Sequence, residues 1–196
     1  MQKRLCITAA IMVLTIAGLM VASPFAPPVQ AMEASSNEKR EAAEQLVLEF
    51  WKRVWNPPHD LAAVQDLVVE DFVLTSAGTD IQGRDAFAKW IAAFQTKARD
   101  LRLEAYETFA NAEATRVTSR WRATASNGGM LGSEPDGRPI AFTGIAIWEI
   151  RWTPEGPRLA HNWVERSAWE LYQQLKAAPT LDTRAISLDP FRRPKL

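Results

Sequence analysis

The residues best suited to chemistry lie close together near the carboxyl end of the chain, in the stretch 158–175. His161, Trp163, Glu165 and Ser167 occupy every second position there. Because successive side chains of a β-strand point to opposite faces, this spacing predicts that all four share one face. An imidazole, an indole, a carboxylate and a hydroxyl on one face are typical of the wall of a ligand pocket.

Glu165 is the candidate general base of this stretch. A carboxylate beside tryptophan rings would lose hydration, which raises its pKa and suits proton transfer. The alternatives are an ion pair with Arg120, Arg122 or Arg166, or a solvent-exposed place at the strand end. His161 could polarise a ligand carbonyl or form a hydrogen-bonded part of the pocket wall.

Other residues could complete a hydrophobic ligand pocket. The candidate ligand-binding residues are Trp90, Tyr106, Trp121, Asn127, Trp163 and Ser167. The alternative for the aromatic members is an ordinary core, since each large ring can bury about 150–250 Å². The glycine-rich stretch 126–129 could be a mobile lid or a simple hairpin loop.

Composition argues against several classes of partner and cofactor. The 23 basic and 23 acidic residues balance, so neither nucleic acid nor an anionic membrane surface is an expected partner. The two histidines, His59 and His161, are far apart and have no close acidic cluster, so no metal site is expected. The single cysteine, Cys6, lies in an apolar run. Neither a dinucleotide fingerprint nor a phosphate-loop lysine occurs, so no cofactor is expected.

The amino-terminal segment has the order of a secretory signal peptide. Lys3 and Arg4 precede the apolar run 5–22, and the small-residue site Val29-Gln30-Ala31 follows. We therefore predict a signal peptide over residues 1–31, cleaved after Ala31, and a periplasmic or secreted protein. An uncleaved membrane anchor is the alternative, since a span needs about 20 apolar residues. No other membrane contact is expected. A linker over 32–40, one domain over 41–178 and a tail over 179–196 would follow.

The order of the expected elements defines the fold class. Helices come first: one capped by Ser35 or Ser36 and running to about Trp55, a short one over 61–68 after Asp60, and one opened by residues 83–85. A short strand over 71–76 lies between the second and third helices. Period-two patterns then predict strands over 101–109, 115–125, 140–152 and 158–166, before a final helix over 168–176. Such an order predicts an α+β domain, with a sheet curved around the early helices into a cone.

Motifs spread over residues 42–175 carry a family resemblance. They are Asn56 to Leu61 with Asp71-Phe72-Val73, Gly83-Arg84-Asp85, Arg120-Trp121, Gly137-Arg138-Pro139, Phe142-Thr143-Gly144-Ile145, and Trp163 with Gln173-Gln174-Leu175. Their order and spacing resemble the SnoaL-like polyketide cyclases of the nuclear transport factor 2-like superfamily. The resemblance implies a cone-shaped fold and, as often in that superfamily, a homodimer formed through the outer sheet face.

The resemblance also points to two exchanged groups. Catalytic members of that family have an aspartate four positions after the closing tryptophan and a histidine on the central hairpin. Ser167 and Asn127 stand at these places here. The related epoxide hydrolases have an aspartate at the position of Glu165 and an arginine–aspartate pair where this chain has Arg120 and Arg122.

Two hypotheses for function follow. The first is an exported SnoaL-like domain that binds a small hydrophobic molecule in its cone. It could catalyse a proton-transfer isomerisation or cyclisation with Glu165 as base and His161, Ser167 and Asn127 as orienting groups. The second is a non-catalytic domain that binds a ligand or a protein partner.

Overall fold

A computed structural model describes residues 29–177, with side chains from residue 35 onward. Its elements, in chain order, are α1 (Val29–Val54), α2 (Ala63–Leu67), β1 (Val68–Ser76), β2 (Thr79–Gln82), α3 (Arg84–Lys97), β3 (Ala98–Ala110), β4 (Arg116–Asn127), a 3₁₀ turn (Met130–Gly132), β5 (Pro139–Thr153), β6 (Gly156–Arg166) and α4 (Ala168–Lys176). The four predicted later strands and the final helix are all present, with ends shifted by at most a few residues.

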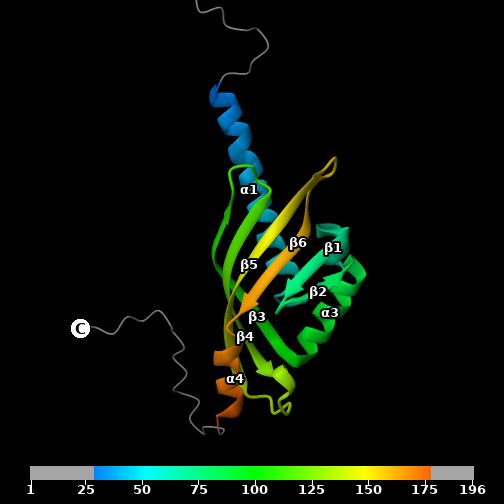
Figure 1. Ribbon diagram of the computed structural model, residues 1–196, viewed down its shortest axis with the longest axis vertical. Helices are drawn as coiled ribbons and strands as arrows, with labels where there is room; N and C mark the ends of the chain where they lie inside the picture. The colour runs from blue at the N-terminus through cyan, green and yellow to red at the C-terminus, as the bar shows by residue number, and fades with distance from the viewer. Residues whose placement is uncertain (1–28, 178–196) are drawn as a thin grey trace, which may run out of the picture.

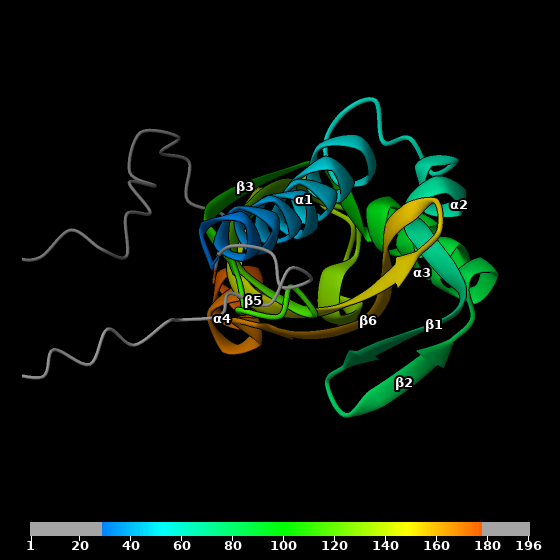
Figure 2. The same ribbon diagram turned by 90° about the horizontal axis from the view of Figure 1, so that it is seen from above.

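The six strands form one sheet in the order β2-β1-β6-β5-β4-β3. Strands β3 to β6 pair antiparallel in sequence order, whereas β1 pairs parallel with β6 and sets Thr75 opposite Trp163. The sheet curves around α1, and α4 follows β6 and lies beside the start of β5 (Figure 2). This is the predicted α+β cone, in which the inner face of the sheet and the helices enclose the core.

Aromatic rings join α1 to the rest of the core. Phe50 is fully buried on the inner side of α1, with Val47 and Val54 within one turn of it. Its ring meets Trp148 of β5 edge-on at 5.0 Å and stacks at 6.0 Å on Phe87 of α3. Burial of one such ring contributes about 1.5–3 kcal/mol, so these contacts fix the helix inside the curve of the sheet.

Hydrogen bonds hold the turn after α1 in place. The Asn56 side chain accepts from the Leu103 N–H and donates to the Leu103 carbonyl, which ties the helix end to β3. Asp60 accepts from the backbone N–H of Ala63 and pairs with Arg53 at 2.7 Å. Asp60 was expected to cap the second helix over 61–68, but the helix begins at Ala63 with Ala62 at the cap position and without a side-chain cap.

The amino-terminal helix differs from the expectation. It begins at Val29 rather than after Ser35 or Ser36, so the predicted linker 32–40 is helical and the predicted cleavage site lies at its start. The first turns of α1 project beyond the sheet (Figure 1). The rest of the predicted signal peptide, and the tail 179–196, fall outside the described residues. Among the described helices, none combines the length and apolarity that a membrane span requires.

A short strand was missed by the sequence analysis. β2 pairs antiparallel with β1 through a turn at Ala77 and Gly78. Its four residues, Thr79 to Gln82, include one apolar side chain and are mostly exposed. A segment this short and polar gives almost no alternation signal. This strand matters because it extends the sheet next to Thr75 of β1, whose hydroxyl contacts His161.

Candidate ligand-binding site

The interior of the cone is the main candidate site. Fifteen residues line it, from α1 and the residue that follows it, from α3 and from strands β1, β3, β4, β5 and β6. Eight of them are aromatic: Trp51, Trp55, Phe87, Trp90, Phe94, Trp121, Phe142 and Trp148. Strand β6 contributes Asn162, Val164 and Arg166, which alternate along its inner face.

These aromatic side chains nearly fill the cone. The remaining cavity measures about 20 Å³, which is room for about one water molecule. Trp121 packs closely on Gly144, where an added Cβ atom would lie 2.3 Å from its ring. The half-buried Trp90 and Phe94 of α3, whose tilted rings lie 5.3 Å apart, form the least buried part of the aromatic wall. A larger ligand therefore needs these side chains to move.

Four buried N–H donors in the lining have no acceptor among the protein atoms. They are the Nε1 groups of Trp55, Trp121 and Trp148 and the Nδ2 group of Asn162. All four residues are at most 6% exposed. Leaving one buried donor unpaired costs about 1–3 kcal/mol, so such groups are rare in folded proteins. All four belong to residues that line this one cavity, whose other lining side chains are apolar except for Arg166 and the Trp51 and Trp90 indole N–H groups.

Arg166 adds a positive charge to the same lining. Its Nη1 donates to Ser76 Oγ at 2.7 Å, and its guanidinium lies over the rings of Trp90 and Phe94 at 5.4 and 5.3 Å. Burial lowers its pKa to about 10, against a smaller opposing effect of Glu165. Among the described residues, no carboxylate lies within ion-pair distance of it. The group remains protonated at neutral pH.

The cone offers no side chain for acid–base chemistry near neutral pH. Within the described part of the chain, its lining holds no aspartate, glutamate, histidine, cysteine, lysine or tyrosine. Asn162 and the indole N–H groups hydrogen-bond but do not exchange protons at that pH. The site can hold and polarise a ligand, and it has no group to take a proton from one.

The predicted pocket wall faces away from the cone. His161, Trp163 and Glu165 do share one face, as expected, but it is the outer face of β6, because Asn162 and Arg166 occupy the inner one. Their expected place in the cone wall is therefore wrong. Glu165 is exposed and does not line the cone, which contradicts the picture of a dehydrated carboxylate there.

His161 lies in a polar cluster on that outer face. Its ring stacks on Trp163 at 3.7 Å, and its Nε2 lies 2.9 Å from the hydroxyl of Thr75, which in turn donates to Asp80 at 2.6 Å. Burial lowers the pKa of His161, while the nearby carboxylates of Glu149 and Asp80 oppose that effect and Arg116 reinforces it. The contacts match the expected hydrogen-bonded wall residue, on the other side of the sheet.

A shallow groove on the outer face brings together four of the predicted residues. Tyr106, Trp121, Glu165 and Ser167 border a space of about 280 Å³ beside Arg120, Ile145 and Arg166. Trp121 and Arg166 therefore line both this groove and the cone. Ser167 is already engaged there: its Oγ accepts from the Thr143 N–H at 2.9 Å and its own N–H donates to the Thr143 carbonyl. Its hydroxyl thus anchors the start of α4 to β5.

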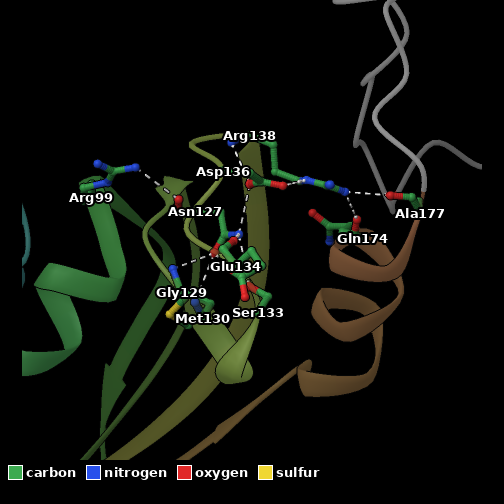
Figure 3. Close-up of polar contacts among 10 residues, drawn as sticks. All are labelled: Arg99, Asn127, Gly129, Met130, Ser133, Glu134, Asp136, Arg138, Gln174 and Ala177. Carbon is green, nitrogen blue, oxygen red and sulfur yellow. Dashed lines mark hydrogen bonds and ion pairs between the residues drawn. The ribbon is translucent and has the colours of Figure 1, made fainter.

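Asn127 holds a loop together. Its side chain donates to Ser133, to the Glu134 carbonyl and to Asp136, and accepts from the N–H groups of Gly129 and Met130 (Figure 3). The side chain is saturated by these contacts and lines neither the cone nor the groove. Its predicted ligand-binding role is replaced by a structural one.

Two functional candidates, Asn162 and Arg166, were missed by the sequence analysis. Each follows a predicted site residue in the sequence, but its side chain lies on the opposite face of β6. Of the remaining predicted residues, Trp90 and Trp121 do line the cone. Among the described residues, no group of three or more histidine, cysteine, aspartate or glutamate side chains could hold a metal ion.

Comparison with known proteins shows the family. The model of the SnoaL-like polyketide cyclases matches residues 45–175, so the chain belongs to this family. None of the curated proteins matches the sequence significantly.

Solved structures share the fold at low identity. A protein described as a SnoaL-like polyketide cyclase from Jannaschia sp. CCS1 superposes with a TM-score of 0.62 at 12% identity, covering 71% of this chain and 95% of that one. A polyketide-cyclase-like protein of Xanthomonas campestris pv. campestris gives 0.58 at 20% identity, covering 70% and 98%. An epoxide hydrolase from M. tuberculosis gives 0.54 at 14% identity, covering 70% and 86%. At these identities the similarity establishes the fold alone.

Proposed function

We propose that this protein binds a small organic molecule with an apolar body in its cone and releases it unchanged. The observation that carries the proposal is the composition of the lining: eight aromatic side chains, unpaired N–H donors and no acid–base group. Aromatic walls with a few placed polar groups are typical of small-molecule sites. Membership in a family of cyclases with a cone-shaped fold supports a ligand in this place.

A catalytic role through Glu165 has less support. A cyclase-type proton transfer needs a base within hydrogen-bond reach of the ligand. Glu165 lies on the far side of the sheet, and the family's aspartate position holds Ser167, whose hydroxyl binds the backbone of Thr143. Binding without conversion is the function that these placements favour.

Titration of the purified protein with a panel of small aromatic and aliphatic molecules, neutral and acidic, tests the proposal. At least one should bind saturably at one per chain and change the tryptophan fluorescence, since five tryptophans line the cone. Ala123→Val, which narrows the cone, should weaken this binding, whereas Thr124→Val on the outer face should not. If no member of the panel binds, or if both variants behave alike, the cone is not the site. The ligand recovered from the complex should be chemically unchanged.

Export of the protein is part of the proposal and rests on the order of the amino-terminal residues. Amino-terminal sequencing of protein recovered from the periplasm or the medium should begin at Met32. A start at Met1 in a membrane fraction would favour the uncleaved anchor instead.

A homodimer is a second proposal, supported by the outer face of the sheet. Phe109, Ile147 and Trp163 lie in one row across β3, β5 and β6, and Ile145 lies in the next row. Phe109 and Ile145 are about half exposed, at 53% and 50%. An apolar patch of this kind can pair with itself across a two-fold axis. Light scattering should give twice the chain mass, and Ile147→Glu should give the monomer mass. A monomeric wild type at high concentration would exclude the dimer.

A further inference from the structure

Within residues 35–177, the half-buried guanidinium of Arg166 has no carboxylate within ion-pair distance. Arg166 offers five N–H donors, and one of them is taken by Ser76. The aromatic rings of Trp90 and Phe94 attract the guanidinium but supply no hydrogen-bond acceptor. An opposite charge brought by a ligand would be the natural partner of this group.

The unpaired donors around the same cavity also favour a ligand with a negative charge. Trp55, Trp121, Trp148 and Asn162 each present an N–H without an acceptor, and none is more than 6% exposed. One water molecule accepts two hydrogen bonds, which is fewer than this lining can donate. A carboxylate accepts about four, and it also supplies the missing negative charge.

We propose that the ligand of the cone carries a single carboxylate on a small apolar body, and that Arg166 and the unpaired N–H donors bind this carboxylate. The inference rests on the proposed function and names the chemical class of its ligand. The aromatic walls would surround the apolar body, while Trp90 and Phe94 would move to admit it. The site recognises the charged head group by contacts that a neutral molecule of equal size cannot make.

Benzoate and benzamide form the matched pair of probes, because they differ in charge and hardly in shape. Calorimetric titration of the full chain at pH 7.5 and low salt should give a Kd for benzoate at least about tenfold lower than for benzamide. Arg166→Gln should abolish this preference. Asn162→Leu should reduce it by a smaller factor, since one of several donors is lost.

Arg166 also borders the outer groove, so Asn162→Leu, at a residue that lines the cone and not the groove, distinguishes the two places, and Arg120→Gln is the control at the groove. It should leave the preference for benzoate intact. Equal affinities for benzoate and benzamide in the wild type, a preference that survives Arg166→Gln, or one that disappears in Arg120→Gln would each overturn the inference. If Arg166→Gln does not fold, the wild-type comparison together with Asn162→Leu decides.

The same titrations distinguish failure of the carboxylate inference from failure of the proposed binding in the cone. Equal one-to-one binding of both probes, sensitive to Ala123→Val, would overturn the carboxylate and leave small-molecule binding in the cone standing. No binding of either probe, or of any other member of the panel, would overturn both.

Discussion

Arg166 and its chain neighbour Glu165 lie on opposite faces of the sheet. The guanidinium lines the cone and lies over the rings of Trp90 and Phe94, whereas the carboxylate lies exposed on the outer face. Adjacent strand residues always separate in this way. Within the described residues, the lining of the cone therefore holds a cation and no acid.

Replacing Arg166 should stabilise the protein. Burial lowers its pKa to about 10 from 12.5, so the folded state holds this proton less tightly than the unfolded state does. At neutral pH the buried charge therefore costs folding free energy, and the cost is relieved as pH rises from about 10. We expect Arg166→Met to raise the free energy of unfolding at pH 7 by about 1–3 kcal/mol, after loss of the Ser76 hydrogen bond. Urea denaturation measures the free energy of unfolding of the variant and of the wild type. A variant less stable than the wild type would show that Arg166 stabilises the fold.

Two buried asparagines should respond in opposite ways to the same change. Asn162→Leu removes an unpaired N–H donor and should leave stability unchanged or raise it by up to about 1 kcal/mol. Asn127→Leu removes the contacts that hold the loop 128–137 and should cost about 3 kcal/mol or more. Thermal unfolding compares the pair. Similar losses in both variants would mean that Asn162 also holds the structure together.

The architecture could be predicted because its strands are long and alternate clearly. The pattern Val117, Ser119, Trp121, Ala123 is buried at every second position, and the sequence analysis placed that strand within two residues of its ends. The start of α1 could not be predicted, because Ser35 and Ser36 are good capping residues and the helix simply continues through them.

The inner face of β6 was harder to predict than its existence. Apolar side chains lie on both faces, with Val164 inside and Trp163 outside, so binary patterning does not distinguish them. A register shift between Glu149 and Ile150 further offsets the strand against β5. Which set of residues lines the cone depends on the partner strands, which the sequence of β6 does not reveal.

Acidification should destabilise the fold through His161. Its pKa is lowered mainly by burial, so between its unfolded value near 6.5 and its lower folded value the unfolded state binds the proton more readily. Stability is therefore full above about pH 6.5 and is lost as pH falls toward the folded pKa. His161→Gln should flatten the dependence of the unfolding free energy on pH between 7.5 and 5.5. Equal slopes in wild type and variant would assign the titration to other groups.

Close packing of Trp121 on Gly144 should make this glycine irreplaceable. A Cβ atom at residue 144 would lie 2.3 Å from the indole ring and 2.6 Å from the Glu165 carbonyl oxygen, so ring and strand must both shift. We expect Gly144→Ala to cost about 1–3 kcal/mol of stability and to change the tryptophan emission of the cone. Gly132→Ala is the matched control, because residue 132 has φ +74° but no atom near the added Cβ. We expect this control to lose about 1 kcal/mol or more of stability through backbone strain alone and to leave the tryptophan emission unchanged. Unchanged emission in Gly144→Ala would mean that the cone wall yields without moving Trp121.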